Sequence, residues 1–383
     1  MPREGHVSEL SLGVIAHTRK ENEYRLPIHP EHLDRIDSDV AGRVYLECGY
    51  GEHFGISDDQ LATSVAGVRT REQLIAECDV ILLAKPDADD LAELRDGQIL
   101  WGWPHCVQDA ELTQQAVDRR LTLIAFEAMN LWGQDGSFKL HVFHKNNEMA
   151  GYCSVLHALQ VIGSTGTYGR RLRAAVIGFG ATARGAVTAL GAIGVGDVDV
   201  LTNRSVAEVA SPIHSANIVQ FESDEDGSSF VLTDDGRVRL AQFLAEHDVV
   251  VNCVLQDPNS PLVFLAEADL PAFRSGSLLI DVSCDAGMGF SWARPTTFDD
   301  PAFVVGDNVT YYAVDHSPSY LWNAATWEIS EALIPYLPTV LGGPESWDGD
   351  ETVRRAIEIR DGTIVNPDIL AFQERSPEYP HVR

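Results

Sequence analysis

Short apolar runs alternate with amphipathic stretches along the first third of the chain. The runs have the length and composition of buried strands, and the stretches between them have helical spacing. Strands are expected at residues 12–17, 44–47, 80–84, 99–103 and 121–126, and helices at 70–78 and 109–119 among others. Because strand, helix and strand in succession form the unit of a parallel sheet, this rhythm predicts a parallel sheet covered by helices on both faces.

A second unit of the same kind follows. A long apolar helix is predicted at 148–162, then a strand at 173–177, a glycine-rich turn and a helix at about 183–193. Further strands are expected at 199–202, 249–254, 278–282 and 303–305. The acidic stretch 222–237, which contains several glycines, predicts a surface hairpin or loop inserted in this unit.

The end of the chain suggests a return to the first domain. Pro318 interrupts the chain just before a final apolar helix, predicted at 321–337. We therefore expect an α/β fold of two Rossmann-like domains with parallel sheets and a cleft between them. Residues 1–146 with 320–383 would form the substrate and catalytic domain, and residues 147–319 the dinucleotide-binding domain.

Composition excludes several classes of protein. The 383 residues, 45% of them hydrophobic, suffice for two globular domains. With 28 basic and 57 acidic residues, the net charge of -29 disfavours binding to nucleic acid or to anionic membranes. No signal peptide or membrane span is apparent, so a cytoplasmic protein acting on small molecules is expected, with self-association left open. The six cysteines form no CxxC pair, which indicates reduced thiols and no zinc site.

The strongest local signal is a glycine-rich turn between a strand and a helix, RAAVIGFGATARG at residues 173–185. Gly178 permits the tight turn, Gly180 lets the backbone approach a pyrophosphate, and Ala183 allows close packing of helix on strand. The N-terminus of the helix favours the anionic group. Because strand and helix are both present, this GxGxxA pattern predicts a dinucleotide site rather than a turn without a ligand.

The end of the next strand bears on the choice of cofactor. Units that bind NAD usually place an acidic residue there, which binds the ribose 2′-hydroxyl. This strand ends instead in Asn203, Arg204 and Ser205, and arginine and serine can bind a 2′-phosphate. Asp199 lies too early, inside the strand, to replace the acid. The sequence therefore favours NADPH over NADH, the alternative for Arg204 being an ordinary solvated arginine.

Four further motifs stand at loops or strand ends, where the catalytic groups of α/β folds collect. They are RKENEYRLPI at 19–28, LLAKP at 82–86, WGWPHC at 101–106 and DVSCDAGMG at 281–289. Taken singly, each has a structural explanation: Lys85 as a solvated lysine, for example, or His105 as a hydrogen-bonded structural histidine. Their order along the chain carries more information than any one of them.

That order resembles the alanine dehydrogenase and saccharopine dehydrogenase superfamily over nearly the whole chain. Within it, residues 126–159, 281–285 and 307–330 look closest to N(5)-(carboxyethyl)ornithine synthase. The resemblance implies an NADPH-dependent oxidoreductase of amino-acid metabolism that acts on CH-NH donors. Its reaction would be the reductive condensation of pyruvate with the side-chain amine of ornithine or lysine.

The resemblance also implies roles for individual residues. Arg25 matches the partner of the oxo-acid carboxylate, which a guanidinium binds bidentately. Lys85 and His105 match the acid–base pair of the family. Glu127 matches an acid near that pair, and Asp285 matches an aspartate beside the nicotinamide. Departures from alanine dehydrogenase at 101–104 and 283–284 count against a simple alanine dehydrogenase.

The chemistry accounts for these residue types. Attack by the amine requires a base, loss of water from the carbinolamine requires an acid, and carboxylates stabilise the iminium cation that accepts the hydride. A histidine or a lysine near other cations can supply the base, so the order in which Lys85 and His105 act stays open. Two alternatives remain: an alanine or saccharopine-type dehydrogenase and, least favoured, a non-catalytic nucleotide-binding protein.

Overall fold

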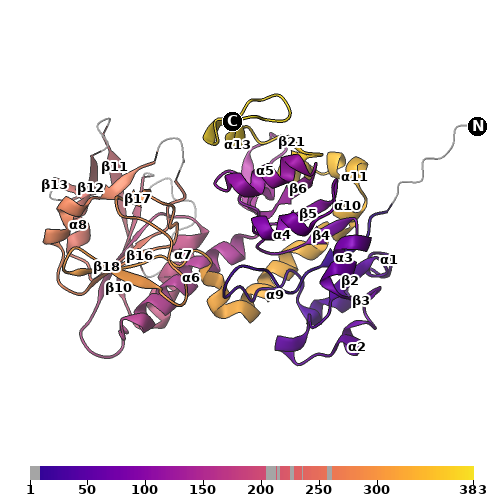
Figure 1. The fold of residues 1–383 in the computed structure, drawn as a ribbon. Coiled ribbons are helices and arrows are strands. Elements are labelled where there is room, and N and C mark those ends of the chain that lie inside the picture. Colours follow the sequence, from indigo (N-terminus) through magenta and orange to yellow (C-terminus); the bar gives the residue numbers. More distant parts are fainter. Residues whose placement is uncertain (1–8, 204–212, 214–215, 225–227, 235, 257–260) are drawn as a thin grey trace, which may run out of the picture. The chain divides into compact units, whose positions relative to one another are not determined.

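Parallel strands form the centre of each of two units (Figure 1). The computed structural model describes residues 9–203, 213, 216–224, 228–234, 236–256 and 261–383. The terminal unit consists of Met1–His144 and Trp322–Arg383, and the middle unit consists of Lys145–Leu321. The predicted α/β class, with a parallel-rich sheet in each of two domains, is confirmed.

The sheet of the terminal unit has the strand order β21-β20-β6-β5-β4-β1-β2-β3. Its strands are β1 (Leu12–Val14), β2 (Val44–Glu47), β3 (Gly67–Arg69), β4 (Val80–Leu82), β5 (Ile99–Gly102), β6 (Thr122–Ala125), β20 (Ile357–Arg360) and β21 (Thr363–Ile364). Strands β1 to β6 pair in parallel, as predicted, whereas β20 and β21 pair antiparallel. Strand β20 was not predicted, although the alternation of isoleucines with Glu358 and Arg360 is itself a pattern of half-buried strands.

Both faces of this sheet are buried. Val80 and Leu82 of β4 pack into one apolar cluster and Ile81, which points to the other face, packs into a second. The covering helices are α1 (Ser38–Ala41), α2 (Asp58–Leu61), α3 (Arg71–Glu77), α4 (Ala88–Glu93), α5 (Ala110–Asp118), α10 (Leu337–Leu341), α11 (Pro344–Gly349), α12 (Glu351–Ala356) and α13 (Pro367–Phe372). A hairpin, β7 (Asn130–Trp132) with β8 (Phe138–His141), follows β6. The predicted cover of helices on a parallel sheet is therefore present.

The late helix predicted at 321–337 is interrupted. Helix α9 (Trp322–Leu333) ends in a short turn at Ile334–Tyr336, and α10 begins at Leu337. Pro335 explains the break, because proline lacks the N–H that would continue the helical hydrogen bonds. Ile329 and Leu333 of α9 nonetheless pack into the same core as the first strands of the chain.

The sheet of the middle unit has the order β13-β12-β11-β10-β9-β14-β16-β19-β18. Its strands are β9 (Arg173–Ile177), β10 (Asp197–Thr202), β11 (Asn217–Ser223), β12 (Ser229–Thr233), β13 (Gly236–Arg239), β14 (Val249–Asn252), β16 (Ser277–Asp281), β18 (Ala302–Val305) and β19 (Val309–Tyr312). The helices include α6 (His144–Val161), α7 (Ala181–Ala192) and α8 (Leu240–Ala245), and β15 (Val263–Leu265) pairs with β17 (Gly289–Phe290). The central six strands run parallel.

The acidic stretch predicted as a surface hairpin or loop, residues 222–237, extends this sheet. Strand β11 pairs in parallel with β10, and β12 and β13 then continue the sheet antiparallel. Phe221 and Val231 are buried in the core of the unit and anchor the extension. The antiparallel pair of β12 and β13 confirms the predicted hairpin, which is part of the sheet.

Helices α6 and α7 touch through their backbones. A Cβ placed on Gly185 would lie 1.7 Å from the carbonyl oxygen of Glu148, and one on Gly151 would lie 1.9 Å from that of Thr182. No side chain fits at such distances, so glycine is required at both positions. This close crossing fixes the helix that follows the glycine-rich turn.

Replacing Gly185 by alanine is expected to lower the free energy of unfolding by about 1–3 kcal/mol or more, because the helices must move apart. Gly191 lies on the same helix, is exposed and has open space around its Cβ position, so Gly191→Ala serves as the control. That control should stabilise the protein by about 0.4–1 kcal/mol. Urea denaturation of the two variants measures both effects, and equal stability of the two would refute the close crossing.

Candidate active site

Three predicted site residues follow three neighbouring strands of the terminal unit. Lys85 follows β4, His105 follows β5, and Glu127 follows β6. These strands are adjacent and parallel, so their carboxyl ends meet at one edge of the sheet. Backbone hydrogen bonds from Leu83 to Trp101 (3.1 Å) and from Trp103 to Ala84 (3.0 Å) extend the pairing toward that edge. The structure therefore brings these three residues together, as the motif order implied.

His105 has an unusual backbone conformation that Glu127 stabilises. Its φ is 49°, in the left-handed region that non-glycine residues rarely adopt. The His105 N–H donates a 2.6 Å hydrogen bond to Oε1 of Glu127, and Nδ1 of the imidazole lies 3.8 Å from the same oxygen. The imidazole itself is 44% exposed. Strained backbone of this kind is common at functional sites, and here it presents an accessible ring beside a carboxylate.

Glu127 combines a buried oxygen with a strongly perturbed titration. A quarter of its side chain is exposed, yet Oε2 is buried and has no hydrogen-bond partner among the described residues. Burial raises the pKa of Glu127 well above its ordinary value, and the nearby carboxyl of Glu358 raises it further. The N–H of His105 and the charge of Lys85 act in the opposite direction. Lys85 and Glu127 are thus within electrostatic reach of one another.

A hydroxyl from the neighbouring loop fixes the backbone at Lys85. Thr18, which follows β1, donates a 2.6 Å hydrogen bond from Oγ1 to the carbonyl oxygen of Lys85. Strand β1 lies next to β4 in the sheet, so this loop borders the same edge. The loop continues to Arg25, the residue expected to bind a carboxylate.

Arg25 is buried and already holds a carboxylate of the protein. Its Nε donates to Oε1 of Glu23 at 2.8 Å, and Nη2 donates to the other oxygen, so Glu23 covers one edge of the guanidinium. The guanidinium carbon lies 5.4 Å from the ring centroid of Trp103, two residues before His105. A role for Glu23 was not predicted, although the motif RKENEYR places it two residues before Arg25.

In the middle unit the glycine-rich turn leaves its backbone open at the start of α7. Gly178 follows β9 with φ of 117°, and a Cβ there would come within 3.1 Å of the Cys253 carbonyl oxygen. Gly180 is the N-cap residue of α7. A Cβ placed on it would have no neighbouring atom within 4 Å, so the space in front of the helix N-terminus is open. Ala183 is fully buried in the core. The open backbone at a helix N-terminus fits an anionic group.

The residues expected to choose between NADPH and NADH are only partly described. Asn203 is exposed directly after β10, whereas Arg204 and Ser205 lie outside the described residues. Asp199 is buried within β10, where His247 Nε2 (2.9 Å) and Arg173 Nη2 (2.8 Å) contact Oδ2. These partners occupy Asp199 inside the unit, in agreement with the expectation that it does not bind ribose.

The DVSCD loop is anchored by its first aspartate. Asp281, at the end of β16, accepts hydrogen bonds from Tyr311 Oη at 2.7 Å, Asn252 Nδ2 at 3.0 Å and Cys284 N at 3.1 Å. Burial raises the pKa of Asp281 to about 6. The strands β9, β14 and β16 are adjacent and parallel, so this loop, with Asp285, stands at the same edge as the glycine-rich turn. The anchoring role of Asp281 was not predicted, because its partners Asn252 and Tyr311 lie far from it in the sequence.

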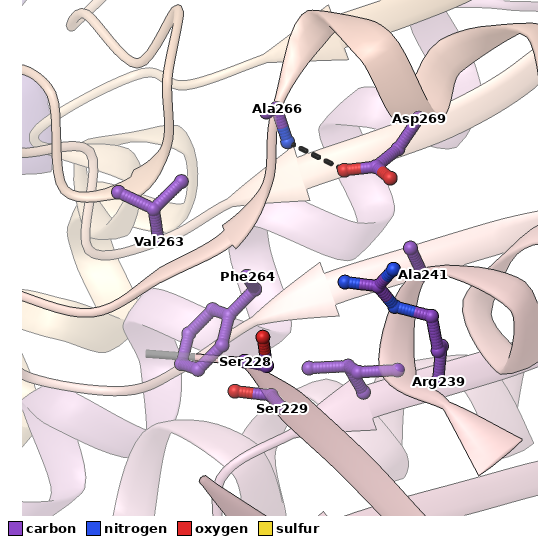
Figure 2. Close-up of a pocket in the computed structure, with 9 residues that line it drawn as sticks. Ser228, Ser229, Arg239, Ala241, Val263, Phe264, Ala266 and Asp269 are labelled. Carbon is purple, nitrogen blue, oxygen red and sulfur yellow. Dashed lines mark hydrogen bonds between the residues drawn. The ribbon is translucent and has the colours of Figure 1, made fainter. Parts of the chain in front are cut away.

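A cavity of about 200 Å³ lies elsewhere in the middle unit (Figure 2). Strand β12, the start of α8, β15 and the turn Glu267–Ala272 line it, and it contains none of the predicted site residues. Asp269 on its rim accepts a 2.9 Å hydrogen bond from the backbone of Ala266, shown dashed in Figure 2. That bond gives Asp269 a local structural role. Since none of the predicted site residues lines the cavity, we do not assign it to the catalytic site.

Among the described residues, no cluster of three or more histidine, cysteine, aspartate or glutamate side chains could hold a metal ion. All six cysteines are free thiols, and only Cys48 is exposed. In the part of the chain that is described, no helix has the length and apolarity needed to cross a membrane.

Comparison with known families gives a match along most of the chain. The family described as "Alanine dehydrogenase/PNT, N-terminal domain" matches residues 13–149. The family described as "Alanine dehydrogenase/PNT, C-terminal domain" matches residues 160–367. Together the two matches include every predicted site residue.

Curated relatives and a solved structure agree with these matches. An N(5)-(carboxyethyl)ornithine synthase of Clostridium botulinum is 25% identical over 322 residues, which cover 81% of this chain and 89% of that protein. An alanine dehydrogenase of Mycobacterium tuberculosis is 26% identical over 343 residues, 86% of each chain. The solved structure of an L-alanine dehydrogenase is 18% identical, with a TM-score of 0.76 over 95% of this chain and 99% of that one. The last similarity shows that the fold is shared.

Proposed function

Because the chain belongs to the alanine dehydrogenase/PNT family, we propose that it condenses pyruvate with the side-chain amine of ornithine or lysine and reduces the product with NADPH. The family and its relatives make it an oxidoreductase acting on amino-acid-related substrates. The observation that supports acid–base chemistry best is the meeting of Lys85, His105 and Glu127 at one sheet edge. In this proposal the terminal unit binds substrates and the middle unit binds the dinucleotide.

The terminal unit supplies the groups that the condensation needs. Arg25 binds the pyruvate carboxylate in exchange for Glu23, whose two oxygens it holds in the structure. Lys85 and His105 exchange protons with the attacking amine and with the departing water. Glu127 holds the His105 backbone and places negative charge near the imidazole, where a cation forms during proton transfer.

In this proposal the middle unit supplies the residues that bind the cofactor. Gly178 and Gly180 would cradle the pyrophosphate at the N-terminus of α7, and Ala183 packs beneath it. Asp285 would stand near the nicotinamide, on the loop that Asp281 anchors. When bound, NADPH supplies the hydride that reduces the imine carbon.

Alanine dehydrogenase is the second candidate, favoured by relatives of that name at similar identity. The two reactions share the oxo acid and the hydride and differ in the amine. Purified protein incubated with pyruvate, NADPH and ornithine, lysine or ammonium separates them when the products are weighed by mass spectrometry. An adduct with ornithine or lysine supports the proposal, and alanine as the sole product supports the second candidate.

Changing Arg204 to aspartate is expected to raise the KM for NADPH and to lower that for NADH. Arginine attracts the 2′-phosphate of NADPH, whereas an aspartate repels it and can bind the ribose 2′-hydroxyl of NADH. Steady-state kinetics with each cofactor measures both shifts. Arg171→Asp, an exchange at an exposed arginine before β9, is the control and should leave the preference unchanged. Equal use of both cofactors by the unmodified protein would contradict the preference.

A further inference from the structure

The first turn of α4 carries a buried carboxylate that serves two partners. Asp90 belongs to the helix that follows Lys85, and its side chain is 2% exposed. Oδ2 accepts a 3.1 Å hydrogen bond from the N–H of Asp87, the residue that caps the helix. Oδ1 instead accepts from Arg71 Nη2 at 2.6 Å. Capping of the helix accounts for only one of the two oxygens, so the contact with Arg71 requires another reason.

Arg71 joins this carboxylate to the loop after β1. It is the first residue of α3, and its Nη1 donates to the carbonyl oxygen of His17 at 2.7 Å. Its Nε donates to Oε2 of Glu93 at 2.6 Å, so each of its three guanidinium nitrogens binds a different residue. Arg19 adds a second link, because its guanidinium contacts both Asp90 and Glu93. Helix α4 and the loop after β1 are thus held against one another.

The same loop holds Lys85. Thr18 donates from Oγ1 to the carbonyl oxygen of Lys85 at 2.6 Å. A closed circuit results, which runs from Lys85 through the Thr18 hydroxyl and the loop to Arg71, on to Asp90, and back through the N–H of Asp87. Because the backbone is held on both sides, Lys85 has little freedom to shift, and a group that transfers protons needs such a fixed position.

The burial of the ion pair in this circuit favours a role in placement over a role in stability. The side chain of Arg71 is 18% exposed and that of Asp90 is 2% exposed. A buried ion pair contributes little net stability, because the removal of both charges from water is costly. Such a pair does supply fixed geometry, since the planar fork of a guanidinium binds its acceptors in set directions.

The arginine that binds pyruvate in the proposed function is anchored separately. Glu23 holds the guanidinium of Arg25, and the N–H of Leu26 donates to Oγ1 of Thr326 on α9 at 2.9 Å. These hydrogen bonds share no residue with the circuit. Loss of the circuit should therefore displace Lys85 more than Arg25.

We propose that Arg71 and Asp90 are positioning residues, which fix the backbone of Lys85, and with it the amine, through this circuit of hydrogen bonds. The inference rests on the proposed function for the part that Lys85 plays in proton transfer. It deepens that function, because it names groups that act on the acid–base site through its backbone and exchange no proton with the substrate.

Amide hydrogen exchange tests the circuit without any substrate. The N–H of Asp87 is bonded to Asp90, and the N–H of Lys20 is bonded to Thr18 Oγ1 at 3.1 Å. Arg71→Met opens the circuit between these two places, so both amides should exchange roughly tenfold faster or more, as expected when a hydrogen bond to a charged group is lost. Mass spectrometry of proteolytic peptides measures the change. Unchanged exchange at both places overturns the proposal.

The matched control is Arg95→Met. Arg95 also binds two backbone carbonyl oxygens, those of Ile75 at 2.7 Å and Cys78 at 2.6 Å. Both lie before β4 in the chain, at the edge of the sheet away from Lys85. This variant should leave exchange after β4 unchanged. Equally fast exchange in both variants would reflect a general loss of stability and would also overturn the proposal.

Kinetics tests the positioning role through a split between kcat and KM. Arg71→Met should lower kcat by up to about a hundredfold, the size of effect expected when a catalytic group is misplaced by about 1 Å. Asp90→Ala opens the circuit at two bonds and should lose at least as much. The KM for pyruvate should stay nearly unchanged in both variants, because Arg25 has its own anchors. An unchanged kcat, or a KM that rises in step with its fall, overturns the positioning role.

A pair of small substitutions tests the contact with Lys85 itself. Thr18→Val removes the hydroxyl with little change of shape and should lower kcat in the same way, whereas Thr18→Ser keeps the hydroxyl and should recover most of the rate. Equal loss in the two variants overturns the positioning role. If hydrogen exchange responds as expected but the unmodified protein condenses no amine, the proposed function fails while the circuit stands.

Discussion

Lys85→Met and His105→Gln should each lower kcat/KM of the condensation by about 10²–10⁴-fold, the usual size of an acid–base contribution. The two residues follow adjacent parallel strands and share the neighbourhood of Glu127, so they act on one substrate. The double variant should be little worse than the poorer single variant, because residues acting as a unit are not additive. Two titrating groups also predict a bell-shaped pH dependence of kcat/KM.

The controls for this prediction come from the same chain. NADPH binding, followed by fluorescence, should survive both changes because neither residue belongs to the glycine-rich turn. Lys139→Met, at an exposed lysine of β8, should leave the rate unchanged. Retention of more than about a tenth of the rate by either single variant, well outside the acid–base range, would return that residue to a structural role.

Arg25→Ala should raise the KM for pyruvate strongly and should also destabilise the protein by about 3–5 kcal/mol, since it removes the guanidinium that is bonded to the buried carboxylate of Glu23. Arg25→Lys should restore neither property fully, because an ammonium cannot form the bidentate contact. Steady-state kinetics at varied pyruvate and urea denaturation measure the two effects separately.

The double variant Arg25→Ala/Glu23→Ala separates substrate binding from structure. Removal of both charges should recover much of the lost stability, because no buried charge remains uncompensated. The KM for pyruvate should stay high, since no guanidinium is left to bind the carboxylate. A return of the KM to its original value in this variant would show that Arg25 serves only to neutralise Glu23.

The parts of the site that lie on parallel strands were predictable from sequence. A short apolar run followed by a polar residue marks the end of a buried strand, and Lys85, His105 and Glu127 each follow such a run. Adjacent parallel strands then place their ends at one edge, so no tertiary information was needed. The glycine-rich turn was equally clear because Gly178 and Gly180 need backbone conformations or space that other residues lack.

The supporting residues could not be found in this way. Glu358, whose charge raises the pKa of Glu127, lies on β20, and this strand pairs antiparallel with a strand more than two hundred residues earlier. The burial of Glu23 against Arg25 likewise depends on packing that only the folded unit supplies. The sequence thus indicates the groups that meet a substrate, while the groups that hold them in place follow from long-range contacts.

The central claim is that hydride from the nicotinamide reduces an imine formed between pyruvate and an amino acid. NADPH carrying deuterium at the transferable position of the nicotinamide tests it directly, with pyruvate and ornithine or lysine as substrates and mass spectrometry of the products. The account predicts an N-(carboxyethyl) amino acid with one deuterium on the carbon that joins the former pyruvate to nitrogen. Two results would contradict the account. In one, deuterium appears only in alanine, which forms when ammonium is added; in the other, deuterium is transferred to no product with any of the amines.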